Sequence, residues 1–261
     1  MDLGLKGRRA LVTGASKGIG LAVAHALAAE GCHIDMAGRG IAALEAARDS
    51  LRESSPSVDI NIYSVDLSRL DGQERLSDAC SGVDILVNNA GANPGGYLED
   101  TVDAVWRDSW DLKVLGYINL CRSFYGAMKE RRSGVIVNII GYAGERLNAR
   151  YIIGTTSNAA LMAFTRSVGS QSPDFGVRVV GVNPGYTATD RAEGILRTIS
   201  EKQFGSADRW RDVETSLNLP FGRMARPTEI ADVVAFLASD RAAYISGTVI
   251  TVDGGATNRN G

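Results

Sequence analysis

Short apolar runs alternate with longer amphipathic stretches along nearly the whole chain. The runs are rich in Val, Ile and Leu and are continuous, which is typical of strands buried on both faces of a parallel sheet. The stretches between them repeat apolar residues at the period of an α-helix. We expect strands at 10–13, 33–37, 60–65, 85–88, 135–140, 177–182 and 249–252. We expect helices at 18–30, 42–54, 70–80, 102–129, 155–170 and 227–238.

This alternation predicts an α/β fold in which βαβ units build a parallel sheet. No repeat, low-complexity tract or Pro-rich linker interrupts it, so we expect a single domain over residues 1–261. One segment departs from the rhythm, because residues 187–222 are polar and helix-prone and follow the end of an expected strand. Ligands of such folds bind outside the carboxyl ends of the strands, so this segment is a candidate lid or substrate loop. The residues expected to cover a substrate are Tyr186, Ile195, Leu196, Phe204 and Trp210.

The sequence TGASKGIG at 13–20 joins the first expected strand directly to the first expected helix. Closely spaced glycines at such a junction leave backbone N–H groups unpaired, and these groups point, with the positive end of the helix, at one spot. Side chains there would obstruct both the turn and the approach of a pyrophosphate. The loop therefore predicts a dinucleotide site.

The expected cofactor preference depends on Ala37-Gly38-Arg39, where the second expected strand ends. An acidic side chain at this point binds the ribose hydroxyls, whereas a basic one pairs with a 2′-phosphate. Gly38 supplies no carboxylate, while Arg39 and Lys17 supply two cations. Asp35 lies within the strand, where alternation turns it away from the strand's end. The sequence thus favours NADP(H) over NAD(H), and the alternative is that both cations are ordinary surface residues.

Composition narrows the expected partners and setting. The net charge of -2, without a long run of one sign, gives no electrostatic reason to expect nucleic acid or an anionic membrane as partner. The three cysteines are widely spaced, so we expect neither a disulfide framework nor a metal site, and a cytoplasmic location is the simplest setting. No apolar stretch approaches membrane-spanning length. His25 and His33 lie inside expected elements and are expected to be structural.

Five motifs together resemble the short-chain dehydrogenase/reductase (SDR) family over essentially the whole chain. They are TGASKGIG at 13–20, Asp66-Leu67, NNAG at 88–91, NPGYTAT at 183–189 and the block GRMARPTEIADVVAFLASDRAAYISGTVITVDGG at 222–255. The resemblance implies a Rossmann-type, doubly wound sheet of seven strands with a nicotinamide dinucleotide across the C-terminal strand ends. It also implies a small-molecule substrate and a homotetramer or homodimer.

The resemblance also implies which residues bind the cofactor. The loop for the pyrophosphate and the 2′-phosphate would consist of Gly14, Ser16, Lys17, Gly18 and Ile19. Asp66 and Leu67 look like the adenine contacts, and Asn88, Ala90 and Gly91 look like the ribose-side wall and the support of the central sheet. The clamp on the nicotinamide carboxamide would consist of Pro184, Gly185, Thr187 and Thr189.

The four residues on which the family's chemistry depends are all replaced. The family uses a Tyr as general acid/base, a Lys four positions later, a Ser thirteen positions before the Tyr, and an upstream Asn. Set against those patterns, this chain carries Gly154 at the Tyr, Asn158 at the Lys, Gly141 at the Ser and Lys113 at the Asn.

Three interpretations remain open. In the first, an oxidoreductase has a displaced constellation: Lys113 and Asn158 have exchanged places, and a phenol comes from Tyr151 or Tyr142. The alternatives are a pocket wall for Tyr151, a packing aromatic for Tyr142 and a solvated or salt-bridged residue for Lys113. In the second interpretation, the protein binds NADP(H) without redox chemistry, as a sensor, regulator or assembly partner. In the third, it is an enzyme that uses the bound cofactor for something other than simple carbonyl reduction, such as a lyase or epimerase.

The sequence favours the first interpretation, an NADP(H)-dependent oxidoreductase acting on a small alcohol or carbonyl. Thr187 and Thr189 would orient a nicotinamide ring for hydride transfer, which a mere binding module has little physical need to do. The helices at 102–129 and 155–170 would supply the family's usual dimer faces, with Phe164 and Met162 among possible packing residues. The alternative is that these helices simply face the sheet.

Overall fold

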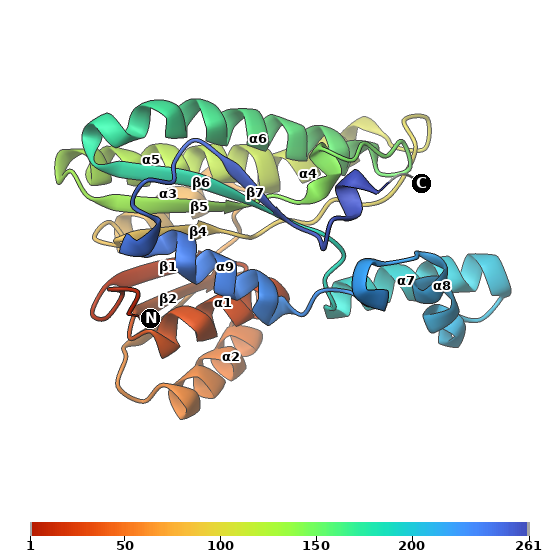
Figure 1. Ribbon diagram of the computed structural model, residues 1–261, viewed down its shortest axis with the longest axis horizontal. Helices are drawn as coiled ribbons and strands as arrows, with labels where there is room; N and C mark the ends of the chain where they lie inside the picture. The colour runs from red at the N-terminus through yellow and green to blue at the C-terminus, as the bar shows by residue number, and fades with distance from the viewer. Residues whose placement is uncertain (1, 260–261) are drawn as a thin grey trace.

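Residues 2–259, which the computed structural model describes, form a seven-stranded parallel sheet with helices on both faces (Figure 1). The strands are β1 (Arg9–Thr13), β2 (His33–Gly38), β3 (Ile60–Ser64), β4 (Ile85–Asn88), β5 (Gly134–Ile139), β6 (Val177–Pro184) and β7 (Val249–Val252). They lie in the order β3-β2-β1-β4-β5-β6-β7. The order reverses between β1 and β4, which is where ligands bind in such sheets. The expected doubly wound α/β fold is confirmed.

Helices cover both faces of the sheet (Figure 1), and an apolar core lies between the sheet and each helix layer. One layer consists of α1 (Gly18–Ala29), α2 (Ile41–Ser54) and α9 (Pro227–Ala238), and the other of α3 (Leu70–Ala79), α5 (Gly116–Glu130) and α6 (Ile152–Gln171). Within β1, Ala10 and Val12 pack in the first core and Leu11 packs in the second. Both faces of the strand are buried, which explains why its apolar run is continuous.

The long helix expected at 102–129 is wrong in one respect. The structure divides it into α4 (Asp103–Trp110), a π-helical turn (Asp111–Leu115) and α5. A π-helical turn adds a residue to one turn and changes the direction of the side chains that follow, and such turns occur frequently at functional sites. Lys113 lies at the centre of this turn and is buried.

Residues 187–222 extend beyond the sheet and carry α7 (Asp190–Phe204) and α8 (Trp210–Ser216), which project to one side of the molecule (Figure 1). Leu196 and Val213 are buried against Met224, with Phe204 and Trp210 packed around them. The expectation that Leu196, Phe204 and Trp210 cover a substrate is therefore wrong, because these side chains form a small core of the segment itself.

The two residues considered for a dimer face lie against the sheet. Met162 is 2% exposed and packs with Ile140 and Leu161, while Phe164 packs against the second core.

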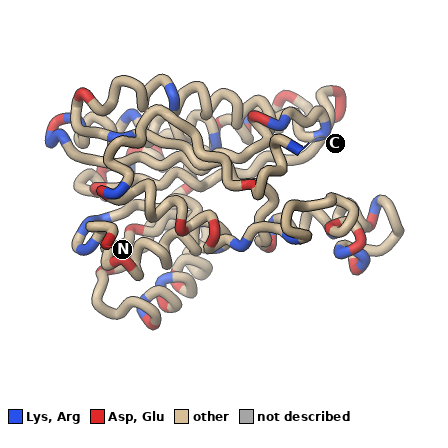
Figure 2. The backbone as a smooth tube through the Cα atoms, in the orientation of Figure 1, with Lys and Arg blue, Asp and Glu red and all other residues tan. Residues whose placement is uncertain are grey.

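Basic and acidic residues are interspersed along the backbone (Figure 2). Within residues 2–259, none of the helices combines the length and apolarity that a membrane span requires.

Candidate active site

A cavity of about 680 Å³ lies where the carboxyl ends of the strands meet. Its walls come from the loops after β1, β2 and β4, the end of β5, the first turns of α6, and the start of α7. Most of the expected site residues line it: Gly14, Ser16, Lys17, Gly18, Ile19, Arg39, Leu67, Ala90, Gly91, Lys113, Tyr142, Tyr151, Asn158, Pro184 and Thr189. Four do not: Asp66, Asn88, Gly185 and Thr187.

The glycine loop has the backbone that a phosphate site requires. Gly14 and Gly18 have positive φ angles of 65° and 58°, which L side chains rarely adopt. A Cβ on Gly20 would collide with the carbonyl oxygen of Gly14 and lie 2.5 Å from Asn89 Nδ2. Lys17 is the N-cap of α1 and gives the helix no side-chain cap, so the first N–H groups of α1 remain available to a bound anion.

Lys17 and Arg39 line the part of the cavity next to the ends of β1 and β2, where the sequence predicts the adenosine. Asp35 does not reach it, because its carboxylate accepts hydrogen bonds from Arg9 at 3.1 Å and Asn61 at 2.8 Å. This ion pair removes the one acidic residue of β2 from the recognition of a ribose.

The four expected residues outside the cavity have structural partners. Asp66 accepts hydrogen bonds from the backbone and hydroxyl of Ser68, which hold the pKa of its carboxyl below the ordinary value. Asn88 is fully buried and donates to Asn138 Oδ1 at 2.9 Å across β4 and β5. Thr187 donates to the carbonyl oxygen of Gly185 at 3.1 Å. Their assignment to cofactor contacts remains a prediction.

The Lys113 side chain lies inside the cavity, and only 9% of the residue is exposed. Its Nζ donates to the carbonyl oxygen of Ile140 at 2.6 Å. A Cβ on Gly91 would lie 3.0 Å from Lys113 Cδ, so the glycine makes room for the lysine stem. Burial, and then the nearby Arg191 guanidinium, lower the pKa of Lys113 to about 7. The amine is therefore largely buried and, among residues 2–259, makes no salt bridge, unlike the solvated or salt-bridged lysine of the alternative interpretation.

Tyr151 occupies the space above Gly154, the position at which the family carries its tyrosine. Tyr151 is the N-cap of α6, and a Cβ on Gly154 would collide with its ring. Only a glycine at 154 accommodates the ring in this place. The Tyr151 ring and a side chain at position 154 therefore exclude each other. The Tyr151 phenol lines the cavity one helical turn before position 154.

Gly141 and Asn158 form a second such pair. Gly141 has a φ of 128°, and a Cβ there would lie 2.9 Å from Asn158 Nδ2. Asn158 is 2% exposed and lines the cavity, yet its Oδ1 accepts no hydrogen bond from residues 2–259. A buried acceptor without a partner is costly and fits a ligand donor such as a ribose hydroxyl. With the uncapped N-terminus of α1, this acceptor makes the residues present fit a nicotinamide dinucleotide.

Tyr142 is a poorer candidate for proton transfer. Its ring lies 6.0 Å from the Tyr186 ring, centroid to centroid, at an interplanar angle of 58°. Burial, and then the charge that Tyr186 would carry, raise the pKa of Tyr142 above its ordinary value. The side chain lines the cavity, but its surroundings disfavour a phenolate.

Arg191, in the first turn of α7, lines the cavity and was not expected from the sequence. Its guanidinium crosses the cavity to donate to the carbonyl oxygens of Gly91 at 3.0 Å and Asn93 at 2.8 Å. The available signal was a basic residue two positions after the end of the NPGYTAT motif. Together with Thr189 and Asp190, it is the only part of residues 187–222 that reaches the cavity in the described chain.

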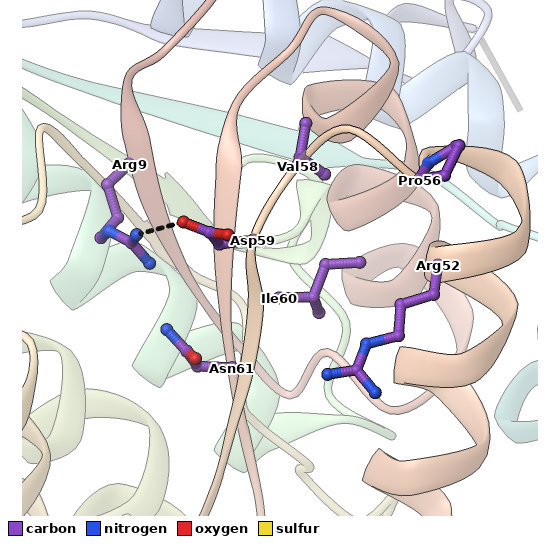
Figure 3. A pocket seen from close by; sticks show the side chains of 7 residues that line it. All are labelled: Arg9, Arg52, Pro56, Val58, Asp59, Ile60 and Asn61. Atoms are coloured by element: carbon purple, nitrogen blue, oxygen red, sulfur yellow. Dashed lines mark hydrogen bonds and ion pairs between the residues drawn. The ribbon is translucent and has the colours of Figure 1, made fainter.

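A second cavity, of about 640 Å³, lies at the opposite end of the sheet around the first residues of β1 and β3 (Figure 3). In this second cavity Arg9 pairs with Asp59 at 3.4 Å and with Asp35, so both Arg9 and Asp59 already have a partner of opposite charge. His25 contacts Ser50 and Ser54 and lines neither of these two cavities. Cys32, Cys80 and Cys121 are buried free thiols. Within residues 2–259, no group of three or more His, Cys, Asp or Glu is arranged to hold a metal.

Comparison with known proteins gives the same family along the whole chain. A family model described as short chain dehydrogenase matches residues 8–199. The chain is 31% identical over 254 residues to the 3-oxoacyl-(acyl-carrier-protein) reductase FabG of Vibrio harveyi, covering 97% of this chain and 98% of that protein. It is 34% identical over 256 residues to galactitol 2-dehydrogenase (L-tagatose-forming) of Cereibacter sphaeroides, covering 97% and 96%. The crystal structure of L-sorbose reductase from Gluconobacter frateurii, complexed with NADPH and L-sorbose, is similar over 100% of both chains, with a TM-score of 0.91 and 30% identity.

Proposed function

The chain belongs to the short-chain dehydrogenase/reductase family of NAD(P)-dependent oxidoreductases, and from that premise we propose that it uses NADP(H) to interconvert a small carbonyl compound and its alcohol at an atypical active site. The observation that carries the proposal is a single cavity that joins the glycine loop, Lys17 and Arg39 to a buried amine and a phenol. The amine is Lys113 and the phenol is Tyr151. The nicotinamide supplies the hydride when it is bound, and the chain supplies position and a proton.

The roles of the chain's residues follow from their places in the cavity. The N–H groups at the start of α1 bind the pyrophosphate, and Asn158 Oδ1 accepts a hydrogen bond from a hydroxyl of the nicotinamide ribose. Tyr151 takes the orienting role that the family gives to a serine, because its phenol lies on the cavity wall and can donate a hydrogen bond to a substrate oxygen. Lys113 provides positive charge beside the reacting oxygen.

The proposal is tested by isothermal titration with NADPH, NADP⁺, NADH and NAD⁺, followed by a panel of alcohols and carbonyl compounds read at the nicotinamide absorbance. Tight NADPH binding with turnover on any substrate supports it. Tight binding without turnover across a broad panel would instead support a binding protein without redox activity. That is the second interpretation of the four replaced residues.

Removing either cation at the adenosine end is expected to reduce the preference for NADPH. Lys17→Ala and Arg39→Ala each lose a charge-assisted hydrogen bond to the 2′-phosphate, which we expect to weaken NADPH binding about tenfold or more. NADH affinity should change little, because NADH lacks that phosphate. The measurement is the ratio of the two dissociation constants by titration calorimetry. Arg52→Ala, an exposed arginine of α2 at the second cavity, is the matched control. Equal losses for NADPH and NADH would refute the assignment.

Restoring the family's serine is expected to destabilise this protein rather than improve it. Gly141→Ser places a side chain at a φ of 128° and against Asn158, and we expect a loss of about 1–3 kcal/mol in the free energy of unfolding without a gain in turnover. Chemical denaturation measures the first and the substrate panel the second. Gly194→Ser, in α7 with nothing near an added Cβ, is the control. A Gly141→Ser variant with higher turnover than the wild type would show that this active site does not require glycine at position 141.

A further inference from the structure

Lys113 is placed as a reacting group rather than as a structural cation. It stands in the π-helical turn between α4 and α5, and only 9% of it is exposed. The one hydrogen bond of its side chain within residues 2–259 is donated to the Ile140 carbonyl oxygen, at 2.6 Å. An ammonium has three donors, so an acceptor in the cavity can take another of them. Ile140 directly precedes Gly141, the position at which the family holds the substrate oxygen.

The charged and titratable groups around Lys113 leave it without a carboxylate partner among the described residues. Arg191 and Asp190 approach from α7, Tyr151 from α6, and Tyr142 from the turn after β5; all four line the same cavity. The loop after β4 presents Gly91 and Ala92, which carry no charge. Within residues 2–259 no ion pair joins the Lys113 amine to a carboxylate, and Arg191 is the charged group that acts on it. A buried lysine without a counter-ion loses its proton readily.

Neither phenol has the surroundings that a proton donor of this kind needs. In this fold a phenol would require a neighbouring cation to favour its phenolate. Tyr142 faces Tyr186 and has a raised pKa. Within residues 2–259 no hydrogen bond of the Tyr151 hydroxyl is found, and the Lys113 ammonium donates to the carbonyl oxygen of Ile140 instead.

We propose that Lys113 is the catalytic residue that exchanges the proton with the substrate oxygen, and that Tyr151 only positions that oxygen. This inference rests on the proposed oxidoreductase function and names the proton-transfer group within it. In reduction, the carbonyl carbon receives a hydride with its two electrons from NADPH, and the carbonyl π-pair moves to oxygen. That oxygen takes a proton from the Lys113 ammonium, so an N–H bond breaks and an O–H bond forms. The products are an alcohol, NADP⁺ and a neutral amine, which regains its proton from water through the open cavity. In oxidation every step runs in reverse.

The ionisation of Lys113 is tested without turnover by NMR of protein selectively labelled with ¹³C at the lysine ε-carbons. The lysines are Lys6, Lys17, Lys113, Lys129 and Lys202. We expect one resonance to titrate near pH 7 and to be missing from Lys113→Met. NADPH is added as the probe of the loaded site, and the same resonance should shift on its addition. If the Lys113 resonance titrates only in the ordinary lysine range, near pH 10.5, the proposal is overturned.

The direction of proton transfer is tested by pH–rate profiles of kcat/KM. Reduction needs the ammonium, so its rate should fall about tenfold per pH unit above the Lys113 pKa, and alcohol oxidation should show the mirror-image limb below it. Tyr151→Phe should lower the rate yet keep both limbs, whereas Lys113→Arg, a cation that does not release its proton, should abolish them. Loss of the limbs in Tyr151→Phe but not in Lys113→Arg would assign the proton to the phenol while leaving the oxidoreductase standing. NADPH binding without turnover in the wild type would refute both the function and this inference.

Discussion

Lys113→Met lowers kcat by about 10²–10⁴-fold, the contribution typical of a general acid or base, while the folded protein becomes more stable. The wild-type chain must bury an amine whose pKa is lowered from 10.5 to about 7, and each unit of that shift costs about 1.4 kcal/mol. Methionine has a similar length and no charge, but it leaves the Ile140 carbonyl oxygen without its donor, which costs about 1–3 kcal/mol. We expect a net gain of about 1–3 kcal/mol in the free energy of unfolding at pH 7.

The stability that Lys113→Met gains over the wild type decreases as the pH rises from 7 to 10.5. Between pH 7 and pH 10.5 the unfolded chain binds a proton at Lys113 that the folded chain has released. Wild-type stability therefore rises with pH across this window. Lys113→Met has no such group, so its advantage is full near pH 7 and disappears toward pH 10.5. Denaturant unfolding at several pH values measures this, with the exposed Lys6→Met as control. A variant that loses both activity and stability would indicate that Lys113 serves the fold.

The strands and the glycine loop could be predicted because local rules determine them. A strand buried on both faces must be apolar throughout, and a turn with a φ near 60° at Gly14 and Gly18 requires glycine. The ends of most elements also follow from such signals, and the expected β7 at 249–252 coincides with the observed strand. Most of the expected cofactor residues lie at one cavity for the same reason, since strand ends of a parallel sheet lie at one edge.

The π-helical turn and the contact of Tyr151 with Gly154 could not be predicted from local patterns. The amphipathic period continues from 102 to 129, whereas the extra residue of the turn at Asp111–Leu115 is decided by tertiary packing. Likewise, the sequence singles out Tyr151 and Gly154 as two separate features and does not predict their contact. Only the fold places the ring of one in the space that a side chain on the other would fill.

The departures from the family's pattern are coupled in space. Gly154 gives room to the Tyr151 ring, and Gly141 gives room to Asn158. Random loss of catalytic residues would leave vacant space or ordinary side chains at these points. Instead, each glycine accommodates a specific polar side chain that lines the cavity. This pattern supports the hypothesis that different residues form a working proton-transfer site, over the hypothesis that the site has lost its activity.

Gly20→Ala is expected to have the largest effect on the cofactor site. Gly20 lies in the first turn of α1, where an added Cβ collides with the carbonyl oxygen of Gly14 and lies 2.5 Å from Asn89 Nδ2. That amide donates to the carbonyl oxygens of Thr13 at 2.9 Å and Gly14 at 3.2 Å, so it ties the loop after β4 to the glycine loop. To relieve the collision, α1 must move away from β1. The N–H groups that bind the pyrophosphate then lose their common direction.

We expect Gly20→Ala to lower the free energy of unfolding by about 1–3 kcal/mol, as overpacking does, and to weaken NADPH binding about 100-fold. Calorimetric titration and denaturant unfolding measure the two effects on one preparation. Gly126→Ala is the matched control, because Gly126 is exposed in α5 with nothing near an added Cβ. Alanine is the better helix former, so that variant should gain about 0.5–1 kcal/mol and bind NADPH normally. Wild-type affinity in Gly20→Ala would mean that the cofactor does not rest on the N-terminus of α1, and the cavity at the strand ends would then need a different ligand.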